Sequence, residues 1–102
     1  MRFEETNDTI YCRFGENMNT IVCAEAAPVL AERIDTVLAR TPGGNVVFDL
    51  KETRYICSGF LRLCILHGKK AGKERFRVEN ASDEVRNVFN MTGLTSLMSP
   101  SQ

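Results

Sequence analysis

The segment Ile56-Cys57-Ser58-Gly59 places a thiol and a hydroxyl side by side where a buried strand is expected to give way to a helix. The first turn of a helix carries backbone N–H groups without intrahelical partners, and these groups favour a negative charge. Ser58 is therefore a candidate phosphate acceptor, because a phosphoserine there would be held by the helix N-terminus. The same position lowers the pKa of a thiol, so Cys57 is a candidate reactive cysteine, although no partner thiol or base stands at a recognisable spacing.

Three nearby side chains also have plain structural interpretations. Ser58 is equally well explained as a helix cap, worth about 1 kcal/mol. Asp49, between apolar neighbours, is expected to be buried near the turn and to support the loop or orient Ser58. Proton transfer is a weaker explanation because no second carboxylate stands at a suitable spacing. His67, near the end of the expected helix, is interpreted as a surface or helix-capping group rather than a catalytic one.

Two elements must position this turn. The compact apolar run Val46-Val47-Phe48 with Leu50 is typical of a central strand. Beyond it, apolar residues return at the spacing of one helix face, at Phe60, Leu61, Cys64 and Ile65. The sequence predicts a helix from Cys57 to about Lys70, ended by Ala71-Gly72.

The N-terminal part predicts two strands and a long helix. Residues 2–5 form an edge strand and 9–14 a half-buried one, with a turn at Asn7-Asp8. A helical apolar pattern then extends from Val22 to Leu38, with Asn19 or Thr20 as its cap. Pro28 opposes a continuous helix, and the alternative is a regular helix that begins near Ala27.

The C-terminal part predicts a strand over 74–79 and a helix over 83–91 capped within 80–82. A last short turn would pack Leu94, Leu97 and Met98, and residues 99–102 are expected to fray. Right-handed crossovers make the strands at 45–50 and 74–79 parallel neighbours. The expected fold is a single small α/β domain over 1–102, with a mixed sheet of four to five strands and helices mainly on one face.

Composition narrows the function classes. Thirteen basic and thirteen acidic residues cancel, so no overall field draws the chain to nucleic acid or to an acidic membrane. An apolar share of 43% and a charged share of 25% are those of an ordinary soluble globular protein. The four cysteines form no C-x-x-C pair and His67 has no cysteine at zinc-finger spacing, so we expect no metal site and four free thiols. No signal-peptide core or membrane-spanning run is visible, which predicts a cytoplasmic protein without membrane insertion.

Beyond these physical patterns, the chain resembles the STAS domain family, shared by sulphate transporters and anti-sigma factor antagonists. The likeness rests on the order of elements, on Ser58-Gly59 after the central strand, and on the late pattern Val85, Phe89, Gly93 and Leu94. Bacterial members commonly carry Asp-Ser-Ser/Thr-Gly at the turn, where this chain has Ile56 and Cys57 in the first two places. Asn19 stands where many members have an aspartate.

The resemblance implies a bacterial, non-enzymatic regulator of transcription that acts by partner switching. In such proteins an anti-sigma factor that is also a serine kinase phosphorylates the serine corresponding to Ser58, and only the unmodified protein binds it. The partner would be a kinase-fold protein that uses ATP. The implied docking surface combines the turn, the adjacent loop and the exposed side of the following helix, namely Asn19, Thr20, Ile56, Cys57, Ser58, Gly59 and Arg62.

Two other classes remain open. An unswitched STAS subunit of a transport or other multiprotein complex would use the apolar Ile56-Cys57 pair for a constant packed contact. A thiol enzyme would rest on Cys57. No cofactor is expected, although nucleotide binding is left open by a sequence without a phosphate-cradling glycine loop. The sequence also leaves open whether the protein forms a homodimer.

Overall fold

The computed structural model describes residues 1–72 and 74–97. Their main sheet has the strand order β1-β2-β4-β6, formed by β1 (Arg2–Glu5), β2 (Thr9–Arg13), β4 (Asn45–Asp49) and β6 (Phe76–Glu79). β1 is antiparallel to β2, whereas β2, β4 and β6 are parallel. The mixed sheet and the parallel pairing of the two later strands confirm the sequence prediction.

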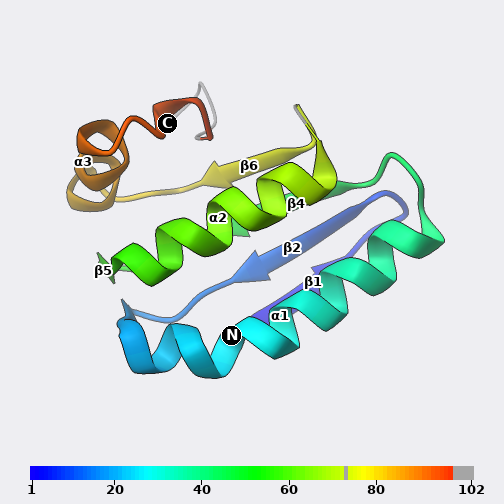
Figure 1. The fold of residues 1–102 in the computed structure, drawn as a ribbon, viewed down its shortest axis with the longest axis horizontal. Coiled ribbons are helices and arrows are strands. Elements are labelled where there is room, and N and C mark those ends of the chain that lie inside the picture. The colour runs from blue at the N-terminus through cyan, green and yellow to red at the C-terminus, as the bar shows by residue number, and fades with distance from the viewer. Residues whose placement is uncertain (73, 98–102) are drawn as a thin grey trace.

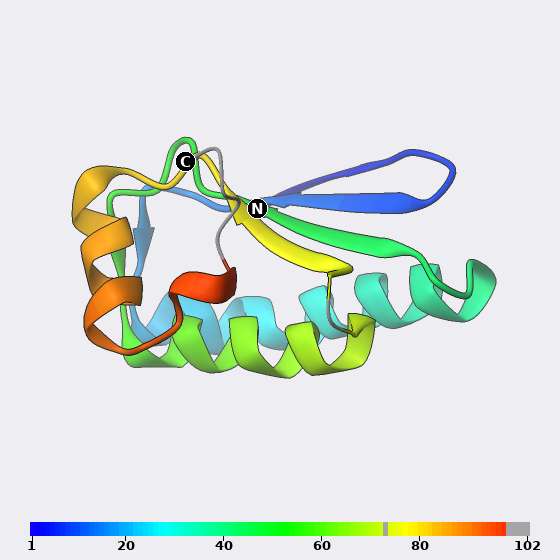
Figure 2. The same cartoon turned by 90° about the horizontal axis from the view of Figure 1, so that it is seen from above.

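Two long helices form a second layer on one face of this sheet. They are α1 (Thr20–Arg40) and α2 (Ser58–Ala71), which lie side by side beneath it in Figure 2. The shorter α3 (Asp83–Met91) stands across one end of the two layers, and η1 (Thr95–Leu97) follows it (Figures 1 and 2). Among the described residues no helix covers the other face of the sheet (Figure 2). Helices mainly on one face is the arrangement that the sequence predicted.

The core lies between the sheet and the α1–α2 layer. Alternate residues of the parallel strands point into it and are buried: Ile10, Cys12, Val46, Phe48, Phe76 and Val78. Phe14 packs edge-on against Phe48 and Phe60, with ring centroids 4.8 and 4.9 Å apart. The aromatic cluster therefore joins β4 to the first turn of α2, just beyond Ser58.

The apolar run of β4 is continuous because both of its faces are covered. Val47 points to the face without helices, yet its exposed fraction is 0%. Its neighbours in register are Tyr11 on β2 and Arg77 on β6, whose long side chains can cover apolar surface while their polar ends stay in water. The central strand is thus dry on both sides although helices cover only one of them.

A second, two-stranded parallel sheet was not predicted from the sequence. It pairs β3 (Asn17–Met18) with β5 (Tyr55–Ile56). β3 lies just before the N-terminus of α1, and β5 lies just before the N-terminus of α2. Each strand has only two residues, so the sequence shows no alternating apolar pattern from which a strand could be predicted. This small sheet matters because it determines where the Cys57-Ser58-Gly59 turn lies.

α1 runs without a break from Thr20 to Arg40 and contains Pro28, so the alternative start near Ala27 is wrong. Asn19 is the cap: its side-chain oxygen accepts a hydrogen bond of 2.9 Å from the backbone N–H of Val22. The buried stripe of the helix already includes Cys23 and Ala26 before the proline. Packing of that first turn and the cap outweigh the local cost of Pro28.

Pro28→Ala is therefore expected to stabilise the protein by about 1–2 kcal/mol. Proline in a helix interior costs about 3 kcal/mol relative to alanine, and part of this is offset because proline also restricts the unfolded chain. The new N–H would donate to the carbonyl oxygen of Ala24. Urea unfolding measures the change, with the exposed Glu25→Ala as a control expected to stay within about 0.5 kcal/mol. An unchanged or lower midpoint for Pro28→Ala would contradict this account.

His67 corrects a sequence prediction: it is not a surface or capping group. Its exposed fraction is 0%, and it belongs to the buried stripe of α2 with Phe60, Cys64 and Ala71. Its ring centroid lies 6.1 Å from that of Phe48. Neither ring nitrogen has a hydrogen-bond partner among the described residues. Burial lowers the pKa of His67 to about 4, with a smaller contribution from the charge of Lys70, so the ring is neutral near pH 7.

The C-terminal elements follow the prediction with small shifts. Ser82 caps α3 through a 3.2 Å hydrogen bond from the N–H of Val85 to its side-chain oxygen. β6 begins at Phe76 rather than at residue 74, because Glu74 has a left-handed backbone (φ 73°) that cannot continue a strand. The predicted packing of Met98 and the fraying of 99–102 lie outside the described residues.

Candidate functional site

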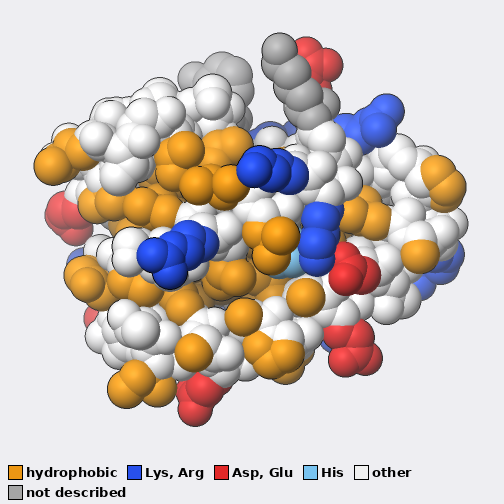
Figure 3. Space-filling model, in the orientation of Figure 1, with side chains coloured by type: hydrophobic (Ala, Val, Ile, Leu, Met, Phe, Trp, Pro, Cys, Tyr) orange, Lys and Arg blue, Asp and Glu red, His pale blue; other side chains and the backbone are white. Residues whose placement is uncertain are grey.

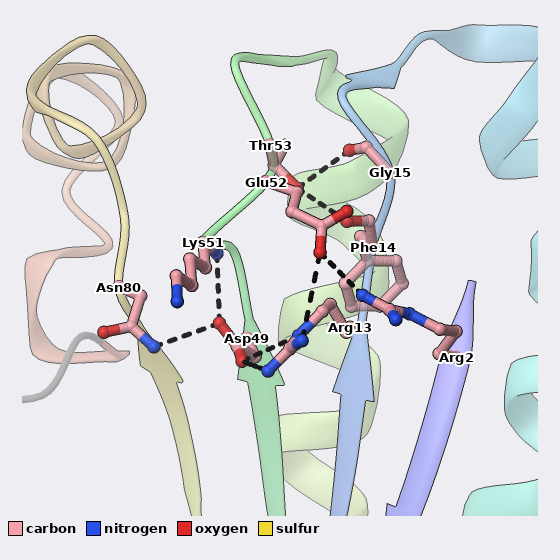
Figure 4. Close-up of polar contacts among 9 residues, drawn as sticks. All are labelled: Arg2, Arg13, Phe14, Gly15, Asp49, Lys51, Glu52, Thr53 and Asn80. Atoms are coloured by element: carbon pink, nitrogen blue, oxygen red, sulfur yellow. Dashed lines mark hydrogen bonds and ion pairs between the residues drawn. The ribbon is translucent and has the colours of Figure 1, made fainter.

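Backbone and side-chain hydrogen bonds tie the segment before α2 to the segment before α1. The N–H of Arg54 donates to the carbonyl oxygen of Glu16 at 2.8 Å, and that of Cys57 to the carbonyl oxygen of Met18 at 3.2 Å. Thr53, 1% exposed, donates its hydroxyl to the carbonyl oxygen of Gly15 at 2.9 Å (Figure 4). These bonds extend the β3–β5 pairing into a continuous seam.

This seam delivers two helix N-termini to one place. α1 begins at Thr20 and α2 begins at Ser58, and in each case a single residue separates the helix from the preceding strand, Asn19 after β3 and Cys57 after β5. Because β3 and β5 are parallel and in register, both helices start at the same end of the molecule (Figure 1). The positive ends of two helix dipoles therefore lie close to the turn that the sequence singled out.

Ser58 is the first residue of α2 and its side chain is exposed. The N-cap position belongs to Cys57, whose side chain makes no capping hydrogen bond, so the interpretation of Ser58 as a helix cap is wrong. The strand that precedes the turn is the short β5 rather than the central β4. The hydroxyl thus faces solvent at the positive end of a helix of 14 residues without serving its capping.

Cys57 is half-buried, and four hydrogen-bond donors surround its sulfur. Burial by itself opposes ionisation, but the backbone N–H of Phe60, the thiol of Cys23, the N–H of Gly59 and the hydroxyl of Thr20 together lower the pKa of Cys57. The Cys23 sulfur lies 3.8 Å from the Cys57 sulfur. This neighbour is not evident from the sequence, since the two cysteines are 34 positions apart and only the unpredicted β3–β5 pairing brings them together.

The residues of the predicted docking surface come together, with one exception. Thr20, Ser58 and Arg62 are exposed, and Asn19, Cys57 and Gly59 are half-buried. The prediction that Ile56 belongs to this surface is wrong. Ile56 is 5% exposed and packs in the core, because alternate residues of β5 point inward. Its side chain does not belong to the surface, and hereafter the docking surface means the other six residues.

The fold is similar to that of a solved structure, although no similarity is found from the sequence. No protein-family model matches the sequence, and no curated protein matches it. The solved structure of the anti-sigma factor antagonist SpoIIAA in its unphosphorylated form matches with a TM-score of 0.74, over 96% of this chain and 84% of that one, at 17% sequence identity. The fold is STAS-like. The predicted fold class is thereby confirmed.

A polar cluster at the carboxyl ends of the parallel strands supports the loop of this STAS-like fold. Asp49, at the end of β4, accepts hydrogen bonds from the guanidinium of Arg13 at 3.0 and 3.1 Å, from the side-chain amide of Asn80 at 3.0 Å and from the N–H of Lys51 at 3.0 Å (Figure 4). Burial opposes its ionisation, but the bonds from Asn80, Lys51 and Arg13 outweigh burial and lower the pKa of Asp49.

Asp49 therefore supports the loop, as one of the two predicted roles requires, and its bonded partners do not include Ser58. The carboxylate joins three successive parallel strands, because Arg13 ends β2 and Asn80 follows β6. Glu52 extends the cluster outward through Arg2 at 2.6 Å and Arg13 at 3.8 Å. The cluster fixes the point from which the chain departs toward β5 and Ser58.

A metal site, a membrane-spanning helix and a ligand pocket each place requirements on the described residues. Within 1–72 and 74–97, no three side chains of the His, Cys, Asp or Glu type are grouped to hold a metal ion. None of the described helices is long and apolar enough to cross a membrane. A hollow of about 510 Å³ lies on the sheet face opposite α1 and α2, lined mainly by polar side chains that include Arg2, Tyr11 and Arg13.

Proposed function

We propose that this protein is a cytosolic, non-enzymatic regulatory module that binds an anti-sigma factor of the serine-kinase type and is switched by phosphorylation at Ser58. The observation that carries the proposal is the exposed hydroxyl of Ser58 in the first residue of α2, within a fold similar to that of an anti-sigma factor antagonist. A kinase can reach this oxygen without unfolding the domain, and the partner would be the kinase itself.

The charges around the turn make such a switch effective. Arg62 is the only charged residue of the docking surface, so the unmodified surface is weakly positive. A phosphate adds about −1.5 to −2 charges and reverses that sign. The N–H groups of the first turn of α2 can accommodate the phosphate, so phosphorylation changes the docking surface and leaves the fold intact.

The direct test is the intact mass of the protein after incubation with ATP and the kinase-fold protein that co-purifies with it from its own cell extract. We expect a gain of one phosphate, on the tryptic peptide 55–62, in which Ser58 is the only serine or threonine. Ser58→Ala should abolish the gain, whereas Ser96→Ala, an exposed serine in η1, should retain it. Phosphorylation that persists in Ser58→Ala would exclude Ser58 as the acceptor.

Binding should respond to the same group. We expect the phosphorylated protein to bind the kinase-fold partner at least about tenfold more weakly, since an uncompensated charge in an interface costs 1.4 kcal/mol or more. Isothermal titration of the two forms measures the ratio. Equal affinities would contradict switching even if Ser58 is modified.

A charge reversal on α2 tests the position of the docking surface. Arg62→Glu should weaken binding of the same partner, while Lys69→Glu should not. Both residues are exposed on α2. Lys69 lies seven positions after Arg62, which places it on the same side of the helix, about 10 Å farther from Ser58. Equal effects of the two variants would indicate a general charge effect instead of local contact.

The second candidate is an unswitched subunit of a transport or other multiprotein complex. Burial of Ile56 removes the apolar pair first used in its favour. A different feature supports it: hydrophobic side chains gather between α2 and the α3–η1 segment (Figure 3), where a groove of about 590 Å³ is lined by residues that include Ile65, Leu94 and Leu97. Stable co-purification with a transporter ATPase, with Ser58 unmodified, would favour this candidate.

A further inference from the structure

We propose that Cys57 and Cys23 form a redox pair in which peroxide oxidises Cys57 and Cys23 then closes a reversible disulfide between the N-terminal turns of α1 and α2. The proposal goes beyond the switching function above and does not depend on it. It rests on a juxtaposition in the fold: two thiols from different helices, each within the first turn or at its cap, face each other across the seam formed by β3 and β5.

The distance between the two sulfur atoms suits this chemistry. They lie 3.8 Å apart, in contact but unbonded. A disulfide bond is about 2.05 Å long, so the sulfurs must approach by about 1.8 Å, which rotation of the side chains and a small shift of the helix ends can supply. Gly59 leaves room for that shift: a side chain there would begin 3.4 Å from the Cys57 sulfur and 3.8 Å from Cβ of Cys23.

The two thiols are also chemically distinct, as a peroxide-reactive cysteine and its resolving partner should be. Cys57 is half-buried, so a small oxidant can reach it, and the N–H groups at the start of α2 favour its thiolate. Cys23 is buried beneath it and its thiol also lies 3.5 Å from the carbonyl oxygen of Met18. Burial raises the pKa of Cys23 to about 12, so Cys23 stays protonated until it meets an oxidised partner.

The other two cysteines are excluded by their surroundings. Cys12 and Cys64 have exposed fractions of 0%, one in β2 and the other in the middle of α2. Burial raises the pKa of Cys12 to about 12 and that of Cys64 still further. Both are small core residues without access for an oxidant.

The reaction balances with hydrogen peroxide as the oxidant. The Cys57 thiolate attacks one peroxide oxygen, the O–O bond breaks, and the products are a Cys57 sulfenic acid and hydroxide, which takes a proton to give water. The Cys23 sulfur then attacks the Cys57 sulfur, an S–S bond forms, the S–O bond breaks, and the hydroxyl leaves as water with the Cys23 proton. A dithiol such as reduced dithiothreitol restores both thiols by exchange.

The sequence makes the test unambiguous, because each of the four cysteines lies on its own tryptic peptide: 3–13, 14–33, 55–62 and 63–69. The intact protein is treated with hydrogen peroxide, its remaining thiols are alkylated in denaturant, and the digest is mapped without reduction. We expect peptides 14–33 and 55–62 to be joined, with the loss of two hydrogen atoms, and dithiothreitol to separate them. Before oxidation, Cys57 should be alkylated at least about tenfold faster than Cys12 or Cys64 in the folded protein.

Two variants identify the roles. Cys64→Ala, which removes a core thiol from the same helix, should still form the bridge. In Cys23→Ser, no bridge should form and the Cys57 sulfenic acid should persist and react with dimedone. If either variant fails to fold, as judged by circular dichroism, the wild-type peptide map decides. A map in which Cys57 gains two oxygens without linkage, or in which Cys23 remains alkylated after peroxide, would overturn the proposal.

Discussion

Asp49→Ala is expected to lower the free energy of unfolding by about 3 kcal/mol. The Asp49 side chain is 12% exposed, and its carboxylate accepts hydrogen bonds from Arg13, Asn80 and the N–H of Lys51. Hydrogen bonds to a charged group are worth about 1.5–3 kcal/mol each, and removal of one member of a buried pair costs about 3–5 kcal/mol. The remaining access of Arg13 to water places the expected value at the lower end. Urea unfolding near pH 7 measures it.

Glu52→Ala provides the matched control. Glu52 belongs to the same cluster and contacts Arg2 and Arg13, but its side chain is 52% exposed. Exposed ion pairs are worth less than about 1 kcal/mol, so the control should change little. Comparable losses in the two variants would show that general charge balance, and not the buried bonds of Asp49, stabilises this end of the sheet.

Asp49→Ala should also loosen the start of the loop that leads to Ser58. Asp49 accepts the N–H of Lys51, the first residue of the loop that leads through Thr53 to β5 and Ser58. Its removal frees the start of that loop, while the bonds of Thr53 to Phe14 and Gly15 still hold the middle. Hydrogen exchange should therefore rise more at Lys51 than at Arg54.

Much of the fold was predictable because it rests on local signals. The caps at Asn19 and Ser82 each follow from a few neighbouring residues, and both are confirmed. The right-handed crossover rule then placed β4 beside β6. The sequence also located the start of α2 to within one residue, because the apolar spacing of a helix face begins at Phe60.

What the sequence did not reveal depends on distant contacts. The β3–β5 pairing consists of two residues in each strand, so no periodicity announces it, and without it neither the Cys23–Cys57 pair nor the burial of Ile56 can be inferred. The partnership of Arg13 with Asp49 was accessible in principle, since both residues end parallel strands and the carboxyl ends of such strands meet at one edge.

His67 was misassigned for a different reason. His67 lies on the same helical face as Phe60 and Cys64, at spacings of four and three residues, and that spacing indicates burial. Its polar side chain and its place near the end of the helix led to the prediction of a surface position. The spacing was the better guide, because an imidazole that is neutral near pH 7 can be buried in a core.

Acidification from pH 7 to pH 4 is expected to remove about 3 kcal/mol of stability through His67. Its pKa falls from 6.5 in the unfolded chain to about 4 in the folded protein, so the unfolded state binds more protons between these values. Stability from this group is complete above about pH 6.5 and is lost as the pH falls toward 4, at 1.36 kcal/mol for each unit of difference in pKa. Urea unfolding at half-unit steps of pH measures the curve.

His67→Leu separates this effect from that of the acidic groups. Leucine has a similar volume and no titratable nitrogen, so the loss between pH 6.5 and 4 should disappear. At pH 7 the variant should be as stable as the wild type or more stable, because the two ring nitrogens lack partners among the described residues. Asp49, whose pKa is lowered, contributes stability that is lost only below its ordinary value near 3.8, so both proteins should share that later decline. A wild-type curve that is flat from pH 6.5 to 4 would contradict this account. It would mean that the imidazole is protonated as readily in the folded protein as in water, although burial in a dry core should lower its pKa.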